Sequence, residues 1–220
     1  GPLGFGWSWS LGMHAIEDDT SGIVSIVQEN GSVVAFAPDG SGGYQSGAHA
    51  TASLSRAGDV LTFTRMGRDV FGFGSPSADG PEATRFRVES RSDPLGNRLD
   101  FSYTSGRLMT VTHNSGTPSA ADDRLLSMTY VDGRVASISD PAGRQATFGY
   151  VGGELRSVVD LDGKTWAFTY DSAHRLVTVT DPYVAPGASN GTLENHYDSR
   201  GRVDWQEGGL KRRTTIGYDL

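Results

Sequence analysis

Tyrosines recur at a nearly constant spacing along the second half of the chain, and this internal repeat constrains the fold most. They stand at 103, 130, 150, 170, 197 and 218, so their separations are 27, 20, 20, 27 and 21 residues. The period is about 20 or 21 residues, with two turn-rich insertions, Asn114 to Asp123 and Tyr183 to Gly191. A unit this short holds two strands and two turns, and it buries a core only by stacking on its neighbours. The spacing therefore predicts an all-β repeat architecture.

Each repeat has a strand pattern that ends at its tyrosine. Successive side chains of a strand point to opposite faces, so alternate residues share one face. This groups Leu99 with Phe101 and Tyr103, Ala146 with Phe148 and Tyr150, and Trp166 with Phe168 and Tyr170. After the turn, an apolar pair is spaced by three, which predicts a β-bulge or a corner; the pairs are Leu108 with Val111, Val135 with Ile138, Leu155 with Val158 and Leu176 with Val179.

The turn that follows each tyrosine is centred on a glycine. These glycines are Gly106, Gly133, Gly153 and Gly201, while His174 takes the equivalent place after Tyr170. Glycine at a fixed turn position indicates a positive φ, which His174 would adopt only with some strain.

Aspartates also recur in phase with the repeat, at Asp93, Asp140, Asp160, Asp162 and Asp181. Paired catalytic carboxylates and calcium ligands are the alternative interpretations. A catalytic pair is usually unique, whereas a residue present in every copy is better explained as a turn element whose carboxylate binds the turn backbone. The segment Asp160 to Gly163 is also too short for an EF-hand loop. We therefore predict turn aspartates.

Residues 1–92 show strand patterns without this repeat. Asn30-Gly31 lies between the β-rich runs Gly22 to Val27 and Ser32 to Phe36, which predicts a hairpin whose two central turn residues both have positive φ. Val60 to Thr64 and Arg68 to Phe73 form a looser pair of runs, and the Gly-, Ser- and Pro-rich segments between these strands read as loops. We predict an amino-terminal β region over 1–92 and repeats over 93–220, the last of which stops partway through a copy.

Composition excludes several classes of function. The chain has no cysteine, so thiolate metal sites and cysteine nucleophiles are absent. Its net charge of −7 disfavours nucleic acid as a partner. No apolar run approaches the roughly 20 residues that span a bilayer, and the first residues lack the features of a signal peptide. The five histidines are scattered, no Gly-x-Ser-x-Gly elbow occurs, and we expect no metal, no cofactor and no enzymatic activity.

The repeats resemble the RHS/YD-repeat family, whose signature is Tyr-Asp-x-x-Gly-Arg followed by an Asp-Pro-x-Gly turn. The match is complete from Tyr197 and Asp198 to Gly201 and Arg202. It lacks only the glycine in the copy that starts at Tyr170 and Asp171, and the other copies keep tyrosine and glycine, as at Tyr103 with Gly106 and Tyr150 with Gly153. The segment Gly1 to Ser10 resembles the one that precedes the repeats in such proteins. Gly1 to Gly4 also fits the remnant of a cleaved tag, although the smooth continuation to Trp7 favours native sequence.

The resemblance implies a curled or spiralling antiparallel β-sheet that forms part of a hollow shell. In bacterial polymorphic toxins and insecticidal toxin complexes such a shell encloses a C-terminal toxin, and in teneurins a related shell serves adhesion. We therefore expect a structural wall segment of a secreted or cell-surface bacterial protein, with the rest of the shell and its cargo as partners. A cut sheet leaves a raw edge, so self-association through an edge strand is also expected.

Four tryptophans support an alternative function. Trp7, Trp9, Trp166 and Trp205 could stack on sugar rings if they faced solvent, which would make the chain an extracellular carbohydrate- or cell-surface-binding module. Burial within the sheet is the favoured interpretation, because aromatic stripes pack well there.

Overall fold

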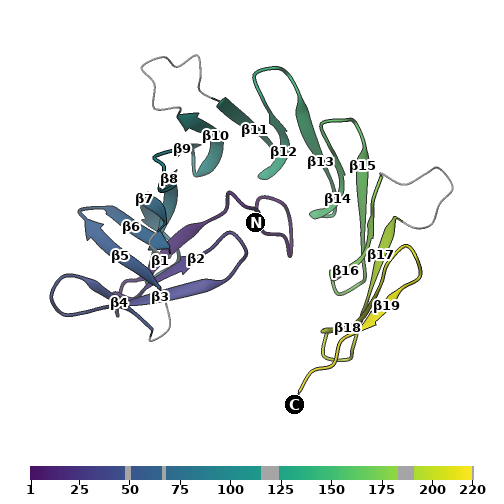
Figure 1. Cartoon of the computed structure of the whole chain (residues 1–220), viewed down its shortest axis with the longest axis horizontal. Helices are drawn as coiled ribbons and strands as arrows, with labels where there is room; N and C mark the ends of the chain where they lie inside the picture. The colour runs from purple at the N-terminus through teal and green to yellow at the C-terminus, as the bar shows by residue number, and fades with distance from the viewer. Residues whose placement is uncertain (48–50, 66–67, 115–123, 183–190, 220) are drawn as a thin grey trace. The chain divides into compact units, whose positions relative to one another are not determined.

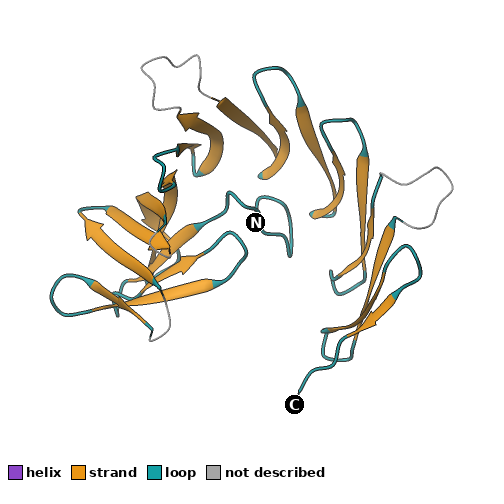
Figure 2. Cartoon of the chain, in the orientation of Figure 1, coloured by secondary structure: helices purple, strands orange, loops and turns teal. Residues whose placement is uncertain are grey.

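The computed structural model describes residues 1–47, 51–65, 68–114, 124–182 and 191–219. These residues form 19 strands and no helix (Figure 2), so no described segment offers a helix that could span a membrane. Every pairing between the described strands is antiparallel. The predicted all-β, antiparallel fold class is confirmed. The chain divides into two compact units, which we call the amino-terminal unit (Ser8–Ser127) and the repeat unit (Gly1–Trp7 with Met128–Leu220).

The strands of the amino-terminal unit follow each other mostly as hairpins. They are β1 His14–Asp18, β2 Val24–Val27, β3 Val33–Pro38, β4 Tyr44–Ser46, β5 Ala52–Ala57, β6 Val60–Arg65, β7 Asp69–Ala78, β8 Ala83–Ser92, β9 Arg98–Thr104 and β10 Arg107–Asn114; β11, Arg124–Val131, begins in this unit. The boundary that we predicted after residue 92 falls at the end of β8 and stays a prediction.

Two strands of this unit make pairings between distant parts of the sequence. Strand β1 lies between β2 and β8, so that His14 is opposite Val27 on one side and Arg87 on the other. Strand β8 has two partners along one edge: its residues 83–87 pair with β1, and its residues 90–92 pair with β9. The other edge of β8 pairs with β7. Strand β8 therefore connects the first strands of the chain to the first tyrosine repeat.

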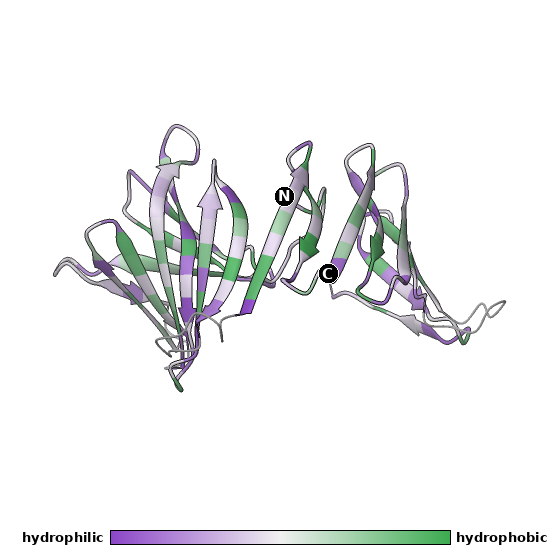
Figure 3. Ribbon diagram, turned by 90° about the horizontal axis from the view of Figure 1, so that it is seen from above, coloured by the Kyte–Doolittle hydropathy of each residue, from purple (hydrophilic) through white to green (hydrophobic). Residues whose placement is uncertain are grey.

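The core of the amino-terminal unit is aromatic and aliphatic. Hydrophobic and hydrophilic positions alternate along its strands, as Figure 3 shows. The fully buried side chains include Ile26, Phe36, Leu61, Phe63 and Phe73. Phe63 contacts both Phe36 and Phe71 at ring-centroid distances of 5.9 Å. Removing one such ring would cost about 3–5 kcal/mol of folding free energy.

The hairpin around Asn30-Gly31 forms, but its turn differs from the predicted one. Strands β2 and β3 pair as expected. Only Gly31 of the two central residues has a positive φ, and the turn extends from Gln28 to Ser32 with the Asn30 side chain accepting a hydrogen bond from the Ser32 amide. The prediction of two residues with positive φ was wrong, because the asparagine side chain stabilises a longer turn.

The repeat unit is a ladder of consecutive hairpins. After the end of β11 it contains β12 Arg134–Ser139, β13 Gln145–Val151, β14 Glu154–Val159, β15 Thr165–Tyr170, β16 Leu176–Thr180, β17 Thr192–Tyr197, β18 Val203–Glu207 and β19 Arg213–Thr215. Each strand from β13 to β18 pairs with the strands before and after it in the sequence, as can be followed in Figure 1. Its buried apolar side chains are Leu3, Met128, Val135, Leu155 and Phe168.

Candidate functional site

Five of the repeat tyrosines are bonded to the preceding hairpin. The hydroxyl of Tyr150 donates a hydrogen bond to the carbonyl oxygen of Val135 at 2.9 Å. The same bond recurs, at 2.7–2.8 Å, from Tyr103 to Val88, Tyr170 to Leu155, Tyr197 to Leu176 and Tyr218 to Val203. Burial raises the pKa of Tyr150 to about 12 and raises the pKa of Tyr170 and Tyr197 as well. The tyrosines therefore hold successive hairpins together as neutral donors.

An arginine from the preceding repeat lies over each of several tyrosine rings. It is the residue just before the one whose carbonyl accepts the tyrosine hydroxyl. The guanidinium carbon lies 5.9, 4.5 and 4.3 Å from the ring centroid in the pairs Arg134–Tyr150, Arg175–Tyr197 and Arg202–Tyr218. We call each set of tyrosine, carbonyl and arginine a repeat junction. A cation over an aromatic face contributes about 0.5–2 kcal/mol, depending on its exposure.

The aspartate of the Tyr-Asp motif builds the turn and also binds the arginine. Asp198 Oδ1 accepts hydrogen bonds from the backbone amides of Arg200 and Arg202, and its Oδ2 accepts one from Arg202 Nε at 2.9 Å. Asp171 does the same with Ala173 and Arg175. These bonds hold the pKa of both carboxyl groups below the usual aspartate range. The tyrosine, the aspartate and the arginine of the signature thus each have a structural role.

The Asp-Pro-x-Gly positions form the same five-residue turn. Asp93, Asp140 and Asp160 each accept a hydrogen bond from the backbone amide four residues later. Asp162 donates its own amide to Asp160, and the amide of Asp181 donates to the carbonyl of Gly191. The prediction that the recurring aspartates are turn elements is confirmed for Asp93, Asp140 and Asp160, whose carboxylates bind the turn backbone.

Two kinds of turn follow the tyrosines. Where the aspartate is present, the five-residue turn has positive φ at His174 (62°) or Gly201 (77°). Where it is missing, two consecutive residues have positive φ, namely Ser105-Gly106, Asp132-Gly133 and Gly152-Gly153. The predicted bulge follows both kinds, since the register shifts by one residue beside Leu108, Tyr150, Tyr170 and Tyr197.

One junction departs from the pattern at two positions. Glu154 stands where the other repeats have arginine, and His174 stands where they have glycine. His174 Nδ1 lies 2.7 Å from Glu154 Oε1, while Arg156 Nη2 lies 2.6 Å from the other carboxylate oxygen. Arg156 also replaces the missing arginine over the Tyr170 ring, 5.2 Å from its centroid. The sequence pattern singled out the histidine but not Glu154, which the repeat spacing could have indicated.

The first seven residues pack on the rest of the repeat unit, Met128–Leu220. The carbonyl of Pro2 accepts a hydrogen bond from the amide of Val135 at 2.9 Å, and Leu3 is buried. Trp7 Nε1 donates to Tyr170 Oη at 2.7 Å, and the indole contacts Phe168 edge-on. A side chain at Gly4 would place its Cβ 2.7 Å from the carbonyl oxygen of Gly153.

The tryptophans are engaged in packing to different degrees. His196 stacks on Trp205 with ring centroids 4.9 Å apart, and the Arg213 guanidinium lies 3.9 Å from the indole centroid. His196 and Arg213 belong to β17 and β19, on either side of β18, so both faces of Trp205 are covered. Trp9 and Trp166 are half-buried. The carbohydrate-binding alternative stays a prediction that Trp7 and Trp205 do not support.

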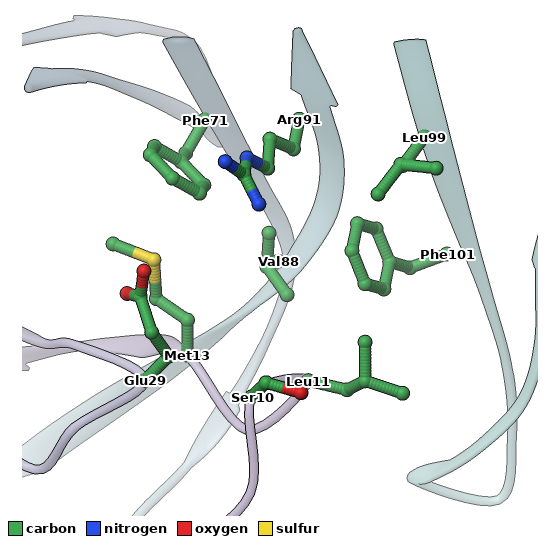
Figure 4. A pocket seen from close by; sticks show the side chains of 9 residues that line it. All are labelled: Ser10, Leu11, Met13, Glu29, Phe71, Val88, Arg91, Leu99 and Phe101. Carbon is green, nitrogen blue, oxygen red and sulfur yellow. The ribbon is translucent and has the colours of Figure 1, made fainter. Parts of the chain in front are cut away.

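A small cavity lined by Leu11 and Met13, among other residues, lies in the amino-terminal unit (Figure 4). It measures about 30 Å³, room for about one water molecule. Glu29 Oε2, buried and without a hydrogen-bond partner, lies at its wall, as does the guanidinium of Arg91. The described residues contain no cluster of three or more metal-ligating side chains.

Comparisons with known proteins found one matching family model and several similar solved structures. Residues 151–183 match the family model described as RHS Repeat. The crystal structures of TcdB2-TccC3-Cdc42 and of TcdB2-TccC3 without its hypervariable C-terminal region each show 13% identity and a TM-score of 0.42. The Photorhabdus luminescens Tc holotoxin pore with a mutated TccC3 shows 14% identity and the same TM-score of 0.42. The matches cover 86% of this chain and 12% of those chains. No curated protein matches the sequence.

The matched residues 151–183 include the junction built on Glu154, Tyr170 and His174. The tyrosine and the arginine of the signature join successive hairpins, and the aspartate builds the turn that holds the arginine. Residues 151–183 are thus an RHS repeat, as the Tyr-Asp motif at Tyr170 and Asp171 predicted.

Proposed function

We propose that the chain is a structural wall segment of a secreted bacterial RHS/YD-repeat protein and encloses a C-terminal toxin or other cargo. The observation that carries this proposal is the bond that recurs from five tyrosine hydroxyls to a carbonyl of the preceding hairpin. Through this bond the tyrosine side chains hold neighbouring hairpins together. A wall needs this chemistry, since each repeat has only its neighbours to pack against.

The same geometry supports the proposal that the chain is not an enzyme. Asp171 and Asp198 are saturated by turn amides and by arginine, and the repeat tyrosines are neutral donors within the sheet. None of these groups is free to act as a general acid, a general base or a nucleophile.

The test uses the full-length product of the parent gene. Its region beyond Leu220 is read first, and further repeats followed by an unrelated terminal domain are the expected arrangement. The intact protein is then treated with protease, and that terminal domain is expected to survive longer than the same domain expressed alone. Substituting Tyr150→Phe and Tyr170→Phe together should shorten its survival. Equal digestion of the enclosed and the free domain would overturn the proposal.

Association through an edge strand is a further part of this proposal. Strand β19 pairs with β18, and no described strand pairs with its other edge. Exposed edges of this kind accept further strands. The 220-residue chain is therefore expected to sediment as a larger species at higher concentration. The amide of Ile216 bonds to Asp204 of the preceding strand, so by alternation the amide of Thr215 faces the open edge. Thr215→Pro should therefore reduce the association, because proline cannot donate at that edge. A monomer at all concentrations would contradict it.

A further inference from the structure

Arg134 occupies the arginine position of a repeat junction but has no carboxylate partner. In the equivalent places Arg175 binds Asp171 and Arg202 binds Asp198, each through Nε and Nη2. The repeat of Arg134 has Val131 directly after its tyrosine, where those repeats have aspartate. Arg134 makes no ion pair with any described residue, and this includes the nearby carboxylate of Asp132.

The guanidinium is nevertheless held in place. It lies over the Tyr150 ring at 5.9 Å from the centroid. Its Nη2 lies 2.7 Å from the point where a Cβ on Gly153 would sit, so the absence of a side chain at Gly153 makes room for it. A fixed, planar fork of donors without an acceptor is suited to bind a carboxylate through two parallel bonds.

The guanidinium lines an open groove of about 380 Å³ in the repeat unit. Gly4 and Gly152 contribute backbone to its wall, and Phe5 contributes a ring that is 65% exposed. His174 also lines the groove. The groove therefore offers backbone groups and one exposed aromatic ring around a single unpaired guanidinium, and groups of these kinds can bind an extended peptide.

The one carboxylate in this groove does not neutralise Arg134. Glu154 is 7% exposed, and its two oxygens are bound by His174 Nδ1 and Arg156 Nη2. A carboxylate that reaches Arg134 must therefore come from outside the repeats that line the groove.

We propose that this groove binds an acidic peptide segment, whose aspartate or glutamate supplies to Arg134 the carboxylate that its own repeat lacks. The bound carboxylate takes the place that Asp171 and Asp198 take beside Arg175 and Arg202. This site goes beyond the wall function, because it describes a specific attachment point for a partner and does not depend on what the wall encloses.

The test titrates the 220-residue chain with a capped tetrapeptide that has two central glutamates, and with the same peptide carrying glutamines. Calorimetry gives the affinity, and NMR follows the Arg Nε–Hε signals. Saturable binding of the glutamate peptide below about 10 mM is expected, with a shift of the Arg134 signal and no binding of the glutamine peptide. The affinity should fall when the salt concentration rises from about 20 to about 300 mM, because the pair is partly exposed.

Matched variants make the assignment specific to Arg134. Arg134→Gln is expected to weaken binding by about tenfold or more, and Arg134→Lys to weaken it less while losing the two-bond geometry. Arg98→Gln removes one charge from the amino-terminal unit and should bind as the wild type does. Thermal unfolding of each variant checks that it is folded.

Three outcomes would overturn the proposal. One is equal binding of the glutamate and glutamine peptides. Another is unchanged binding to Arg134→Gln. The third is displacement of the peptide by inorganic phosphate at a concentration below that of the peptide. This result would assign the site to phosphate and not to a carboxylate.

Discussion

His174 and Glu154 replace, as a pair, the glycine and the arginine that face each other across the neighbouring repeat junctions. His174 Nδ1 lies 2.7 Å from Glu154 Oε1, although the two residues are 20 positions apart in the sequence. At the regular junctions the arginine lies under the turn glycine, as Arg134 does under Gly153 and Arg175 under Gly201. An arginine under a histidine would bring two bulky basic groups together, so the exchange at one position requires the exchange at the other.

This relationship predicts a strong coupling between the two positions. Glu154→Arg alone should lower the free energy of unfolding by about 2–4 kcal/mol, because it leaves Arg156 and His174 facing a new cation. His174→Gly alone should change it by less than about 1 kcal/mol, since the lost bond is offset by relief of the positive φ. The double variant should recover most of the loss, with a coupling energy of at least about 1 kcal/mol in a urea unfolding cycle. Additive effects would show that the exchange is not a compensated pair.

The tyrosine hydroxyl should contribute more to the free energy of unfolding in the middle of the ladder of hairpins than at its last hairpin. Tyr150→Phe leaves the carbonyl of Val135 without its partner in a half-buried position, which costs about 1–2 kcal/mol. Tyr218→Phe removes the equivalent bond at a residue that is 43% exposed, where water replaces the hydroxyl at a cost of about 0.5 kcal/mol or less. Chemical unfolding of both variants tests this order, and equal losses would contradict it.

The same hydroxyl predicts how stability changes at alkaline pH. Burial raises the pKa of Tyr150 to about 12, whereas a tyrosine in the unfolded chain ionises near about 10. The unfolded state therefore releases its proton first, and the stability that Tyr150 provides is present below about pH 10 and is lost as pH rises toward about 12. Tyr150→Phe should flatten this part of the stability profile. A profile that is equally steep without the hydroxyl would place the ionising group elsewhere.

Local features of the sequence predicted the repeat unit well. The tyrosine spacing, the turn glycines and the three-residue spacing of the apolar pairs are short-range signals, and the structure shows the expected hairpins, positive φ angles and bulges. The turn aspartates were predictable for the same reason, since each acts on its own turn. The arginines over the tyrosine rings could have been found as well, because Arg134 and Arg202 each precede their tyrosine by 16 residues.

Contacts between distant segments were not predictable from these patterns. Strand β1 pairs with β8 about 70 residues later, and nothing in the sequence HAIED of β1 specifies that partner. Trp7 reaches Tyr170 across 163 positions. Such pairings depend on which surfaces remain open after the hairpins have formed, and a pattern within one strand carries no information about that.

The turn aspartates predict a second dependence on pH, at the acidic end. Hydrogen bonds from Arg175 hold the pKa of Asp171 below its ordinary value, and those from the Arg202 backbone do the same for Asp198. In the unfolded chain these groups titrate near about 3.9. Their contribution to stability is therefore complete above that pH and is lost as pH falls through the lower pKa of the folded state.

Asparagine at these two positions isolates that contribution. Asp171→Asn with Asp198→Asn should lower stability at neutral pH and make it less dependent on pH below about 4. Asp59→Asn, at a residue for which the structure gives no ion pair or hydrogen bond, serves as the control and should leave the profile unchanged. Thermal unfolding between about pH 2 and pH 7 makes the comparison, and an unchanged acid slope in the double variant would refute the assignment.

Gly153 and Gly143 allow backbone strain to be separated from the role of Gly153 in placing Arg134. Both have positive φ, at 88° and 81°, so alanine at either position should cost about 1–2 kcal/mol of folding free energy. A Cβ at Gly143 meets nothing within 4 Å, whereas one at Gly153 would lie 2.7 Å from Arg134 Nη2. Because the end of an arginine side chain can move, the added loss of stability at Gly153 should stay below about 1 kcal/mol.

The displaced guanidinium should nevertheless leave the Tyr150 ring, and the two variants should then differ in a second measurement. Gly153→Ala is expected to lose binding of the glutamate peptide, while Gly143→Ala keeps it with the same loss of stability. Parallel measurements of the unfolding midpoint and of peptide affinity decide the matter. If Gly153→Ala bound the peptide as well as Gly143→Ala does, the position of Arg134 under Gly153 would have no part in the binding.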